Sequence, residues 1–281
     1  MNDAVPSASP DDALARFRAA RGYIFDMDGV LYRGGEKLPG VNDLFNALQL
    51  RERTIILATN NSMATPATYV SRLAAMGIDI DQANILTSGS ATAAYLEEVL
   101  PPKSGIYVIG MPALRELIFA DGRFQPVQFG EESVAAVVAG LDLSFSYDKL
   151  RLAAAAIRAG ARFVATNSDA TLPTEDGLQP GAGSIMAAIA VASGTQPVVV
   201  GKPEPLMVHE ALRLFDLEAQ ETVMIGDRLD TDILAGERAG TLTALVLTGV
   251  STRDDLASAD PLPDLVFSDL PAMLEALVGN E

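Results

Sequence analysis

The sequence of 281 residues has no cysteine, no tryptophan and only one histidine, His209. The lack of cysteine excludes disulfides, thiolate nucleophiles, iron–sulfur clusters and cysteine-ligated zinc. A single histidine also excludes zinc sites that need two imidazole ligands. We expect His209 to be a partly buried structural residue. The groups left for chemistry are carboxylates, hydroxyls, amides and lysine, with a hard metal ion as a further option.

Positive charge is scarce, because 20 lysines and arginines stand against 37 acidic residues, giving a net charge of −17. Such a protein repels nucleic acids and anionic lipid surfaces, so we expect no nucleic-acid partner. Residues 1–20 lack the basic start and apolar core of a secretion signal, and no apolar run is long enough to span a bilayer. We expect a cytoplasmic protein without membrane contact, with a mobile N-terminal tail over residues 1–20.

Short apolar runs alternate with amphipathic stretches along the rest of the chain. Strands are expected at Tyr23–Phe25, Thr54–Leu57, Ile106–Ile109, Val134–Ala139, Arg162–Ala165, Val198–Val200, Thr222–Ile225 and Leu242–Leu247. Helices are expected at Val41–Arg51, Pro66–Met76, Tyr147–Ala159 and Pro205–Phe215. This alternation is typical of a parallel sheet covered by helices on both faces, so the sequence predicts an α/β fold.

Two aspartates one residue apart, Asp26 and Asp28, follow the strand Tyr23–Phe25 and precede Gly29. In an open parallel sheet, ligands bind beyond the carboxyl ends of the strands, where these acids are expected. A calcium-binding loop is one alternative, but glycine follows Asp28 directly and the next two residues are apolar where oxygen ligands belong. A purely structural turn is the other alternative.

A second group of acids, Asp227, Asp230 and Asp232, follows the strand Thr222–Ile225. Taken alone, this string is an aspartate-rich helix start, which the helix dipole stabilises. Aspartates at two strand ends of one sheet repel each other, however, unless a cation lies between them. Oxygen ligands of this kind suit Mg²⁺, which also binds phosphate oxygens. The two groups together therefore predict a magnesium site.

Two further strand ends carry groups that suit an anion. Lys202 lies between a glycine and a proline, which supports a positioned ammonium facing a phosphate as well as it supports a solvated surface charge. Thr59, Asn60 and Asn61 supply a hydroxyl, two amides and backbone N–H groups at a helix start. A similar string, residues 165–169, indicates either a second layer facing the same pocket or ordinary turn residues.

In order along the chain, these four motifs resemble those of the haloacid dehalogenase superfamily of phosphohydrolases. The long stretch between Thr59 and Lys202 resembles the inserted cap domain of one branch, which contains NagD-like, p-nitrophenyl phosphate, phosphoglycolate and pyridoxal phosphatases. The strings that resemble this branch are Thr59-Asn60-Asn61-Ser62, Pro180-Gly181-Ala182-Gly183-Ser184, Gly201-Lys202-Pro203 and Gly226-Asp227-Arg228-Leu229-Asp230-Thr231-Asp232-Ile233.

The resemblance implies a fold and a division of the chain. The core is a Rossmann-like doubly wound parallel sheet over residues 21–86 and 193–281, and an inserted α/β cap domain covers residues 87–192. A flexible return from cap to core is expected at residues 181–184. Relatives in this branch often pair through their caps, so a homodimer formed through the cap is one expectation.

The resemblance also implies roles for the acids. Asp26 is the nucleophile that attacks phosphorus, and Asp28 is the general acid and base. Mg²⁺ is held by the carboxylates of Asp26 and Asp227 and by the main-chain carbonyl of Asp28. Asp232 orients these ligands without binding the metal itself. Because alternate residues of an extended segment point to one side, both carboxylates of the first pair can flank one phosphoryl group.

The remaining implied site residues bind the substrate. Thr59, Asn60, Asn61 and Lys202 bind the phosphate oxygens. Asn167, Asp169 and Leu172 of the cap are the candidates for substrate selection. The resemblance implies that the vertebrate-type pyridoxal and phosphoglycolate phosphatases place a basic residue where this chain has Leu172. This difference argues against strict specificity for either substrate. A packing role is the alternative for Leu172.

The implied function is Mg²⁺-dependent hydrolysis of small phosphate monoesters through an aspartyl-phosphate intermediate. The substrates expected are of the sugar phosphate, nucleotide, phosphoglycolate or p-nitrophenyl phosphate type. A phosphotransferase or phosphomutase stays open as an alternative, as does a non-hydrolytic, phosphoryl-accepting regulatory protein. A dehalogenase is disfavoured, because that chemistry needs no metal and leaves Asp227 unexplained.

Overall fold

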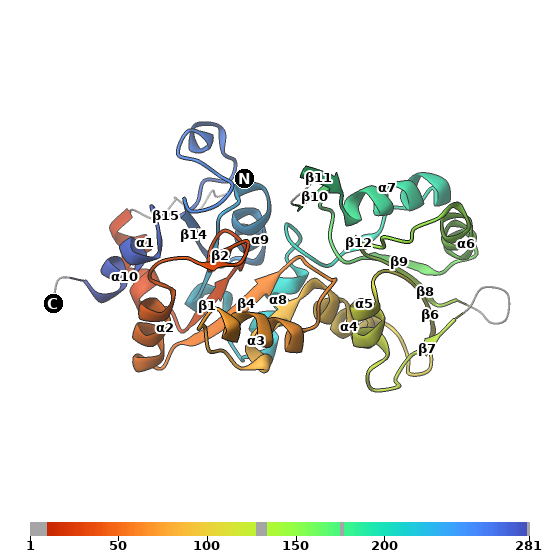
Figure 1. Cartoon of the computed structure of the whole chain (residues 1–281), viewed down its shortest axis with the longest axis horizontal. Helices are drawn as coiled ribbons and strands as arrows, with labels where there is room; N and C mark the ends of the chain where they lie inside the picture. Colours follow the sequence, from red (N-terminus) through yellow and green to blue (C-terminus); the bar gives the residue numbers. More distant parts are fainter. Residues whose placement is uncertain (1–9, 128–133, 175–176, 280–281) are drawn as a thin grey trace, which may run out of the picture. The chain divides into compact units, whose positions relative to one another are not determined.

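The computed structural model describes residues 10–127, 134–174 and 177–279, and the chain divides into two compact units (Figure 1). The first unit comprises Met1–Ala58, Arg72–Asn84 and Val208–Glu281, and the second comprises Thr59–Ser71 and Ile85–Met207.

The strands agree closely with the apolar runs of the sequence. In chain order they are β1 (Gly22–Phe25), β2 (Tyr32–Arg33), β3 (Glu36–Lys37), β4 (Thr54–Thr59), β5 (Ile85–Thr87), β6 (Gly105–Ile109), β7 (Gln125–Pro126), β8 (Ala136–Ala139), β9 (Arg162–Ala165), β10 (Thr171–Thr174), β11 (Gly177–Pro180), β12 (Val198–Val199), β13 (Thr222–Gly226), β14 (Leu242–Val246) and β15 (Leu265–Phe267). Every strand expected from the sequence is present within a few residues.

The helices include the four expected from the sequence and several more. The α-helices are α1 (Pro10–Ala19), α2 (Val41–Leu50), α3 (Pro66–Ala75), α4 (Ser88–Val99), α5 (Pro112–Phe119), α6 (Tyr147–Arg158), α7 (Ala182–Ser193), α8 (Leu206–Leu214), α9 (Leu234–Ala239) and α10 (Leu270–Val278). Short helical turns are η1 (Gln82–Asn84), η2 (Ala219–Glu221), η3 (Leu229–Ile233) and η4 (Asp255–Ser258). Within the described ranges, none of these helices has the length and apolar character needed to cross a membrane.

A six-stranded sheet with the order β15-β14-β13-β1-β4-β5 carries the first acidic motif. β1 pairs in parallel with both β13 and β4, and β14 pairs in parallel with β13 and β15. From β1 the chain adds strands first on one side and later on the other, so the strand order reverses next to β1. The predicted doubly wound α/β core is confirmed, and the reversal point is where such sheets bind ligands.

The stretch expected to be a mobile tail is helical from Pro10 to Ala19. Phe17 of α1 is fully buried, and its ring lies 5.6 Å from the Tyr23 ring and 5.5 Å from the Phe267 ring. This packing of one apolar side chain into the core stabilises a helix that would be marginal alone. The structure therefore differs from the expected tail here; residues 1–9 lie outside the described residues.

The second unit contains its own sheet, with the order β12-β9-β8-β6-β7 and parallel pairing throughout. Val137, Phe163 and Ile189 belong to its buried apolar cluster. β10 and β11 form an antiparallel hairpin. β12, the strand that leads to Lys202, belongs to this second sheet, although the sequence suggested a strand of the core. The boundaries of core and cap given above stay predictions.

One ion pair fixes the loop after β8 in the second unit. The Asp142 side chain is 3% exposed, and its Oδ2 accepts a hydrogen bond of 2.6 Å from Nζ of Lys149 on α6. Its Oδ1 accepts hydrogen bonds from both the backbone N–H and the hydroxyl of Ser144. Burial raises the pKa of Asp142, but the hydrogen bonds from Lys149 and Ser144 outweigh it and leave the pKa below its ordinary value.

We expect Lys149→Met to destabilise the protein by about 2 kcal/mol at pH 7. This cost is smaller than that of breaking a fully buried ion pair, because the Lys149 side chain is 32% exposed. Since the pKa of Asp142 is lowered on folding, the stabilisation is present above the ordinary pKa and is lost as the pH falls through the folded value. The difference between variant and wild type should therefore shrink below about pH 4. Urea unfolding at several pH values measures it.

Arg151→Met is the matched control, because Arg151 lies on the same helix and pairs with Asp148 at side-chain exposures of 54% and 80%. An exposed pair of this kind contributes little, so the control should unfold within about 0.5 kcal/mol of wild type at every pH. Equal effects of the two variants would contradict the role given to Lys149.

Candidate active site

Three aspartates come together at the carboxyl ends of two neighbouring strands of the first unit. Asp26 follows β1, and Asp227 and Asp232 follow β13, which pairs with β1 in register from Gly22 opposite Thr222. One carboxylate oxygen of each lies within 4.8 Å of the others. Asp28 is not a member of this carboxylate group among the described residues. We call Asp26, Asp227 and Asp232 the acid cluster.

The acid cluster has the chemistry of a site for a hard divalent cation. Asp227 is 2% and Asp232 1% exposed, so their charges are shielded from water. Buried carboxylates are stable only when they are paired, hydrogen-bonded or bound to metal. Oδ2 of Asp227 accepts 2.7 Å from the N–H of Val250, and Oδ2 of Asp232 accepts 3.1 Å from the N–H of Arg228. An all-oxygen donor set with several carboxylates fits Mg²⁺ or Ca²⁺.

Glycines hold the acid cluster by leaving no free space beside it. A Cβ atom on Gly226 would lie 2.1 Å from Cβ of Asp232, and one on Gly249 would lie 1.8 Å from Oδ2 of Asp227. Gly29 has φ +82°, and a Cβ atom there would lie 2.6 Å from the same Asp227 oxygen. The backbone thus approaches both carboxylates as closely as atoms allow, which restricts their rotamers.

Asp28 lies beside two arginines of the first unit. Its side chain stays exposed to solvent, but partial loss of hydration is the main influence on its carboxyl and raises its pKa. Arg72 and Arg33 act in the opposite direction and only partly offset this shift. Arg72 lies over the Tyr32 ring, 4.5 Å from its centroid, and donates to the carbonyl of Gly34 at 2.8 Å. Arg72 therefore holds the segment that follows Asp28 in place through these two contacts.

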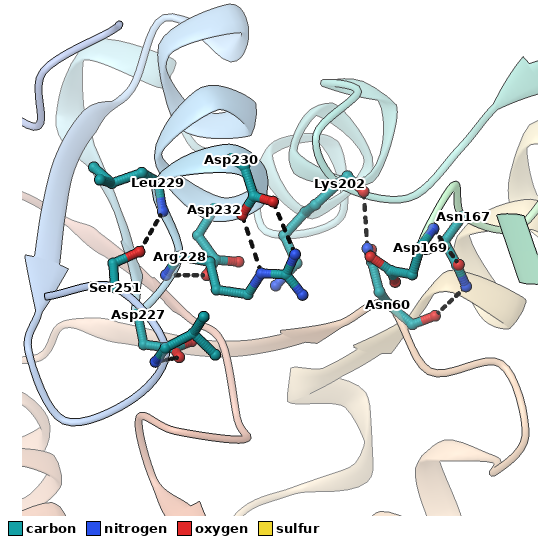
Figure 2. A network of polar contacts seen from close by, with 11 residues as sticks. Asn60, Asn167, Asp169, Lys202, Asp227, Arg228, Leu229, Asp230, Asp232 and Ser251 are labelled. Atoms are coloured by element: carbon teal, nitrogen blue, oxygen red, sulfur yellow. Dashed lines mark hydrogen bonds and ion pairs between the residues drawn. The ribbon is translucent and has the colours of Figure 1, made fainter. Parts of the chain in front are cut away.

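The segment that follows Asp227 forms a single π-helical turn, η3, which contains Asp232. The guanidinium of Arg228 donates to both carboxylate oxygens of Asp230, at 3.1 and 2.9 Å (Figure 2). These bonds lower the pKa of Asp230 despite some opposing desolvation. The backbone N–H of Asp232 donates to the carbonyl of Arg228 at 3.1 Å. The turn closes on itself and returns the Asp232 carboxylate to the cluster.

In the second unit, Asn60 is the centre of a polar network (Figure 2). Its Nδ2 donates to Oδ2 of Asp169 at 3.1 Å and to the carbonyl of Lys202 at 2.8 Å. Its own carbonyl accepts from Nδ2 of Asn167 at 2.8 Å and from the hydroxyl of Ser88 at 2.6 Å. The two similar strings of the sequence, residues 58–62 and 165–169, are therefore joined by direct hydrogen bonds.

Lys202 is 2% exposed, so it is not a solvated surface lysine. Lysine is almost never buried to this degree unless its charge is paired. Asn61 and Thr59 are tied to each other and to the next turn: the N–H of Asn61 donates to Oγ1 of Thr59 at 3.2 Å, and Oδ1 of Asn61 accepts from the N–H of Met63 at 2.8 Å. The structure thus groups all four predicted phosphate-binding residues within the second unit.

Three further residues or segments named from the sequence are Leu172, the glycines of residues 181–184 and His209. Leu172 packs against the apolar cluster of the second unit, which fits the packing alternative. Gly181 and Gly183, expected as a flexible return, begin α7 instead, and Cβ atoms there would lie 2.3 Å from the carbonyl oxygens of Asp169 and Ser168. His209 is exposed on α8 rather than partly buried. The tight glycine contacts explain why residues 181–183 form a packed helix start.

The loop Thr248–Ser251 touches both acidic motifs and was not singled out from the sequence. The hydroxyl of Thr248 donates to the carbonyl of Gly29 at 2.6 Å, and the N–H of Ser251 donates to the carbonyl of Asp227 at 2.9 Å. The usable signal was its position after the predicted strand Leu242–Leu247, because that strand ends at the same edge of the sheet.

Comparisons with known proteins place the chain in a family. A model of the haloacid dehalogenase-like hydrolases matches residues 23–122, and a HAD-hydrolase-like model matches residues 199–273. The 5'-nucleotidase YutF of Bacillus subtilis is 38% identical over 84% of this chain and 90% of its own length.

Two solved structures are similar throughout. A 4-nitrophenylphosphatase from Thermotoga maritima has a TM-score of 0.86 and 35% identity, covering 93% of this chain and 99% of its own. A glycerol phosphate phosphatase from Mycobacterium tuberculosis, in complex with calcium, has a TM-score of 0.84 and 33% identity, covering 92% of this chain and 76% of its own.

The chain therefore belongs to the haloacid dehalogenase-like hydrolases, an enzyme family that generally uses a divalent metal. The predicted resemblance to the branch of NagD-like and p-nitrophenyl phosphate phosphatases is confirmed, as is the prediction of a phosphoric monoester hydrolase.

Proposed function

We propose that this protein is a Mg²⁺-dependent phosphatase that hydrolyses small phosphate monoesters through an aspartyl-phosphate on Asp26. The acid cluster is the observation that carries the proposal, because three buried or half-buried carboxylates converge at the strand-order reversal. The relatives support the substrate class, since they are named for a nucleotide, 4-nitrophenyl phosphate and glycerol phosphate. Asp26 and Asp227, with the main-chain carbonyl of Asp28, would hold Mg²⁺.

Bound Mg²⁺ supplies positive charge that lets an anionic nucleophile approach an anionic ester. In the first step a carboxylate oxygen of Asp26 forms a bond to phosphorus, and the bond from phosphorus to the leaving oxygen breaks. The carboxyl of Asp28 gives its proton to that oxygen, which leaves as an alcohol. In the second step the Asp28 carboxylate takes a proton from water as the water oxygen attacks phosphorus and the bond from phosphorus to the Asp26 oxygen breaks. This restores Asp26 and releases inorganic phosphate.

The polar network of the second unit supports roles in substrate binding. The ammonium of Lys202 and the hydroxyl of Thr59 would stabilise the equatorial phosphate oxygens. The side-chain amide of Asn60 already donates within the protein, so we assign it the task of holding the Lys202 backbone. Asn61, whose amide oxygen accepts a backbone N–H, would shape the same turn.

Substrate choice would lie with the second unit. Asp169 and Asn167 are fixed through Asn60, so a substrate group that contacts them also bears on the position of Lys202. Leu172 would contribute apolar surface next to them. A homodimer formed through the cap and a cytoplasmic location complete the proposal; both are carried over from the sequence analysis.

The test is release of inorganic phosphate from a panel of monoesters: a nucleoside monophosphate, a sugar phosphate, glycerol phosphate, phosphoglycolate and 4-nitrophenyl phosphate. We expect turnover with Mg²⁺ and a fall to background in excess chelator, with recovery on adding Mg²⁺ back. Folded protein that binds Mg²⁺ but releases no phosphate from any ester would overturn hydrolysis. In that case transfer of the phosphoryl group to an added alcohol or sugar acceptor is the next measurement.

A further inference from the structure

The loop Thr248–Ser251, which we call the bridging loop, contacts the loops that carry both acidic motifs. Toward the first motif, the Thr248 hydroxyl donates to the carbonyl of Gly29, and the guanidinium of Arg33 donates to the carbonyl of Thr248. Toward the second, the N–H of Val250 donates to the Asp227 carboxylate at 2.7 Å. The bridging loop therefore ties two chain segments that are far apart in sequence but must act at one metal ion.

Ser251 makes the most specific of these contacts (Figure 2). Its N–H donates to the carbonyl of Asp227 at 2.9 Å, and its Oγ accepts from the N–H of Leu229 at 3.1 Å. Leu229 is the first residue of η3, and the residue before it, Arg228, makes no side-chain capping bond. The first N–H groups of a helix have no partner inside the helix. Ser251, 9% exposed, supplies the missing cap from another segment.

The hydrogen bond by which Ser251 caps η3 also affects the acid cluster. The N–H of Ser251 holds the carbonyl of Asp227, two residues before η3, and its hydroxyl holds Leu229, the first residue of η3. Asp232 lies within η3, three residues after Leu229, so the start of η3 determines where its carboxylate points. Gly249 meanwhile packs against the Asp227 carboxylate without space for a methyl group. One loop thus fixes both acids that β13 contributes.

We propose that the bridging loop sets the affinity of the acid cluster for its divalent ion, with Ser251 as the principal positioning residue. Ser251 does not bind the ion or the substrate. It acts by limiting the separation and orientation of Asp227 and Asp232 before the ion arrives. The proposal rests on the metal site of the proposed function, and it adds a residue that neither the sequence motifs nor the family resemblance assigned.

The test compares Ser251→Ala with Ser251→Thr. Alanine removes the acceptor and leaves the Leu229 N–H without it, whereas threonine keeps a hydroxyl at the same place. We expect alanine to raise the Kd for Mg²⁺ by about 10-fold or more, as loss of such supporting partners does at other metal sites, and threonine to restore most of it. Isothermal titration of the full chain with Mg²⁺ measures both.

Ser258→Ala is the matched control, because Ser258 is exposed and its hydroxyl makes only a 3.4 Å contact with the carbonyl of Asp255. Its Kd should equal that of wild type. Thr248→Val is a second variant for the case in which Ser251→Ala does not fold. It removes the bond to Gly29 and should weaken Mg²⁺ binding at least about threefold.

Thermal unfolding separates positioning from simple stabilisation. A ligand that binds only the folded state raises Tm according to its concentration relative to Kd. At a fixed, sub-saturating Mg²⁺ concentration the rise in Tm over chelator should be smaller in Ser251→Ala than in wild type. A purely structural role would lower Tm equally with and without Mg²⁺ and would overturn the proposal.

The outcomes also distinguish this proposal from the proposed function. If wild type binds Mg²⁺ and Ser251→Ala binds it equally well, the bridging loop does not set metal affinity, and the phosphatase proposal is untouched. If wild type itself shows no Mg²⁺ binding, the metal site of the proposed function fails, and the role of the bridging loop fails with it.

Discussion

Replacing Asp26 by asparagine is expected to lower kcat for phosphate release on the order of 10³-fold or more. The amide keeps the size of the side chain but lacks the anionic oxygen that attacks phosphorus. Phosphate release from 4-nitrophenyl phosphate at saturating Mg²⁺ is the measurement. Asp43→Asn is the control, because Asp43 is an exposed acid in the first turn of α2 and should leave kcat unchanged.

The same variant makes a prediction with the opposite sign for stability. In excess chelator, removal of one carboxylate from the acid cluster relieves repulsion among like charges, so Tm of Asp26→Asn should rise relative to wild type. With Mg²⁺ the order should reverse, because the variant has lost one ligand. Full phosphatase activity in Asp26→Asn would contradict the assignment of Asp26 as the nucleophile, whatever the stability data show.

Replacing Gly249 by alanine is the second substitution with a large expected effect. The added Cβ would lie 1.8 Å from Oδ2 and 2.3 Å from Cγ of Asp227, so the carboxylate must move or the loop must shift. Moving Asp227 also breaks its hydrogen bond from Val250. We expect Mg²⁺ affinity to fall about 100-fold and stability to drop by about 1–3 kcal/mol from overpacking.

Gly35→Ala is the matched control for this substitution. Nothing lies within 4 Å of a Cβ atom built on Gly35, and its φ is not in the left-handed region. The control should bind Mg²⁺ and unfold like wild type. Titration with Mg²⁺ and urea unfolding measure both properties, and unaltered Mg²⁺ binding by folded Gly249→Ala would show that the close contact does not hold Asp227.

The sequence predicted the parts of the fold that follow from local patterns. β1 and β13 were recognised because each is a buried apolar run that is followed by a polar, acidic string. α1 was missed because its first residues belong to a polar, acidic stretch, and its stability comes from Phe17 packing on Phe267 at the other end of the chain. No local signal carries that contact.

The candidate site was predictable to the same extent. Asp26 and Asp227 could be paired from the sequence, since both follow strands of a parallel sheet. The position of Lys202 in the network of Asn60 could not, because it depends on hydrogen bonds between residues more than a hundred positions apart. Ser251 was missed for the same reason: a single serine after a strand is common, and only its contact with Leu229 distinguishes it.

The π-helical turn η3, which contains Asp232, limits how this segment can diverge in evolution. Within a helical turn each residue advances the side-chain direction by roughly a quarter of a circle. Removing or adding one residue in Leu229–Ile233 would turn the Asp232 carboxylate away from its neighbours and displace the residue that Ser251 caps. Exposed side chains such as Asp230 can be exchanged, but insertions and deletions in this segment are not expected to be tolerated. The residues Gly177–Pro180 of β11 are exposed throughout, so we expect exchanges of their side chains to be tolerated as well.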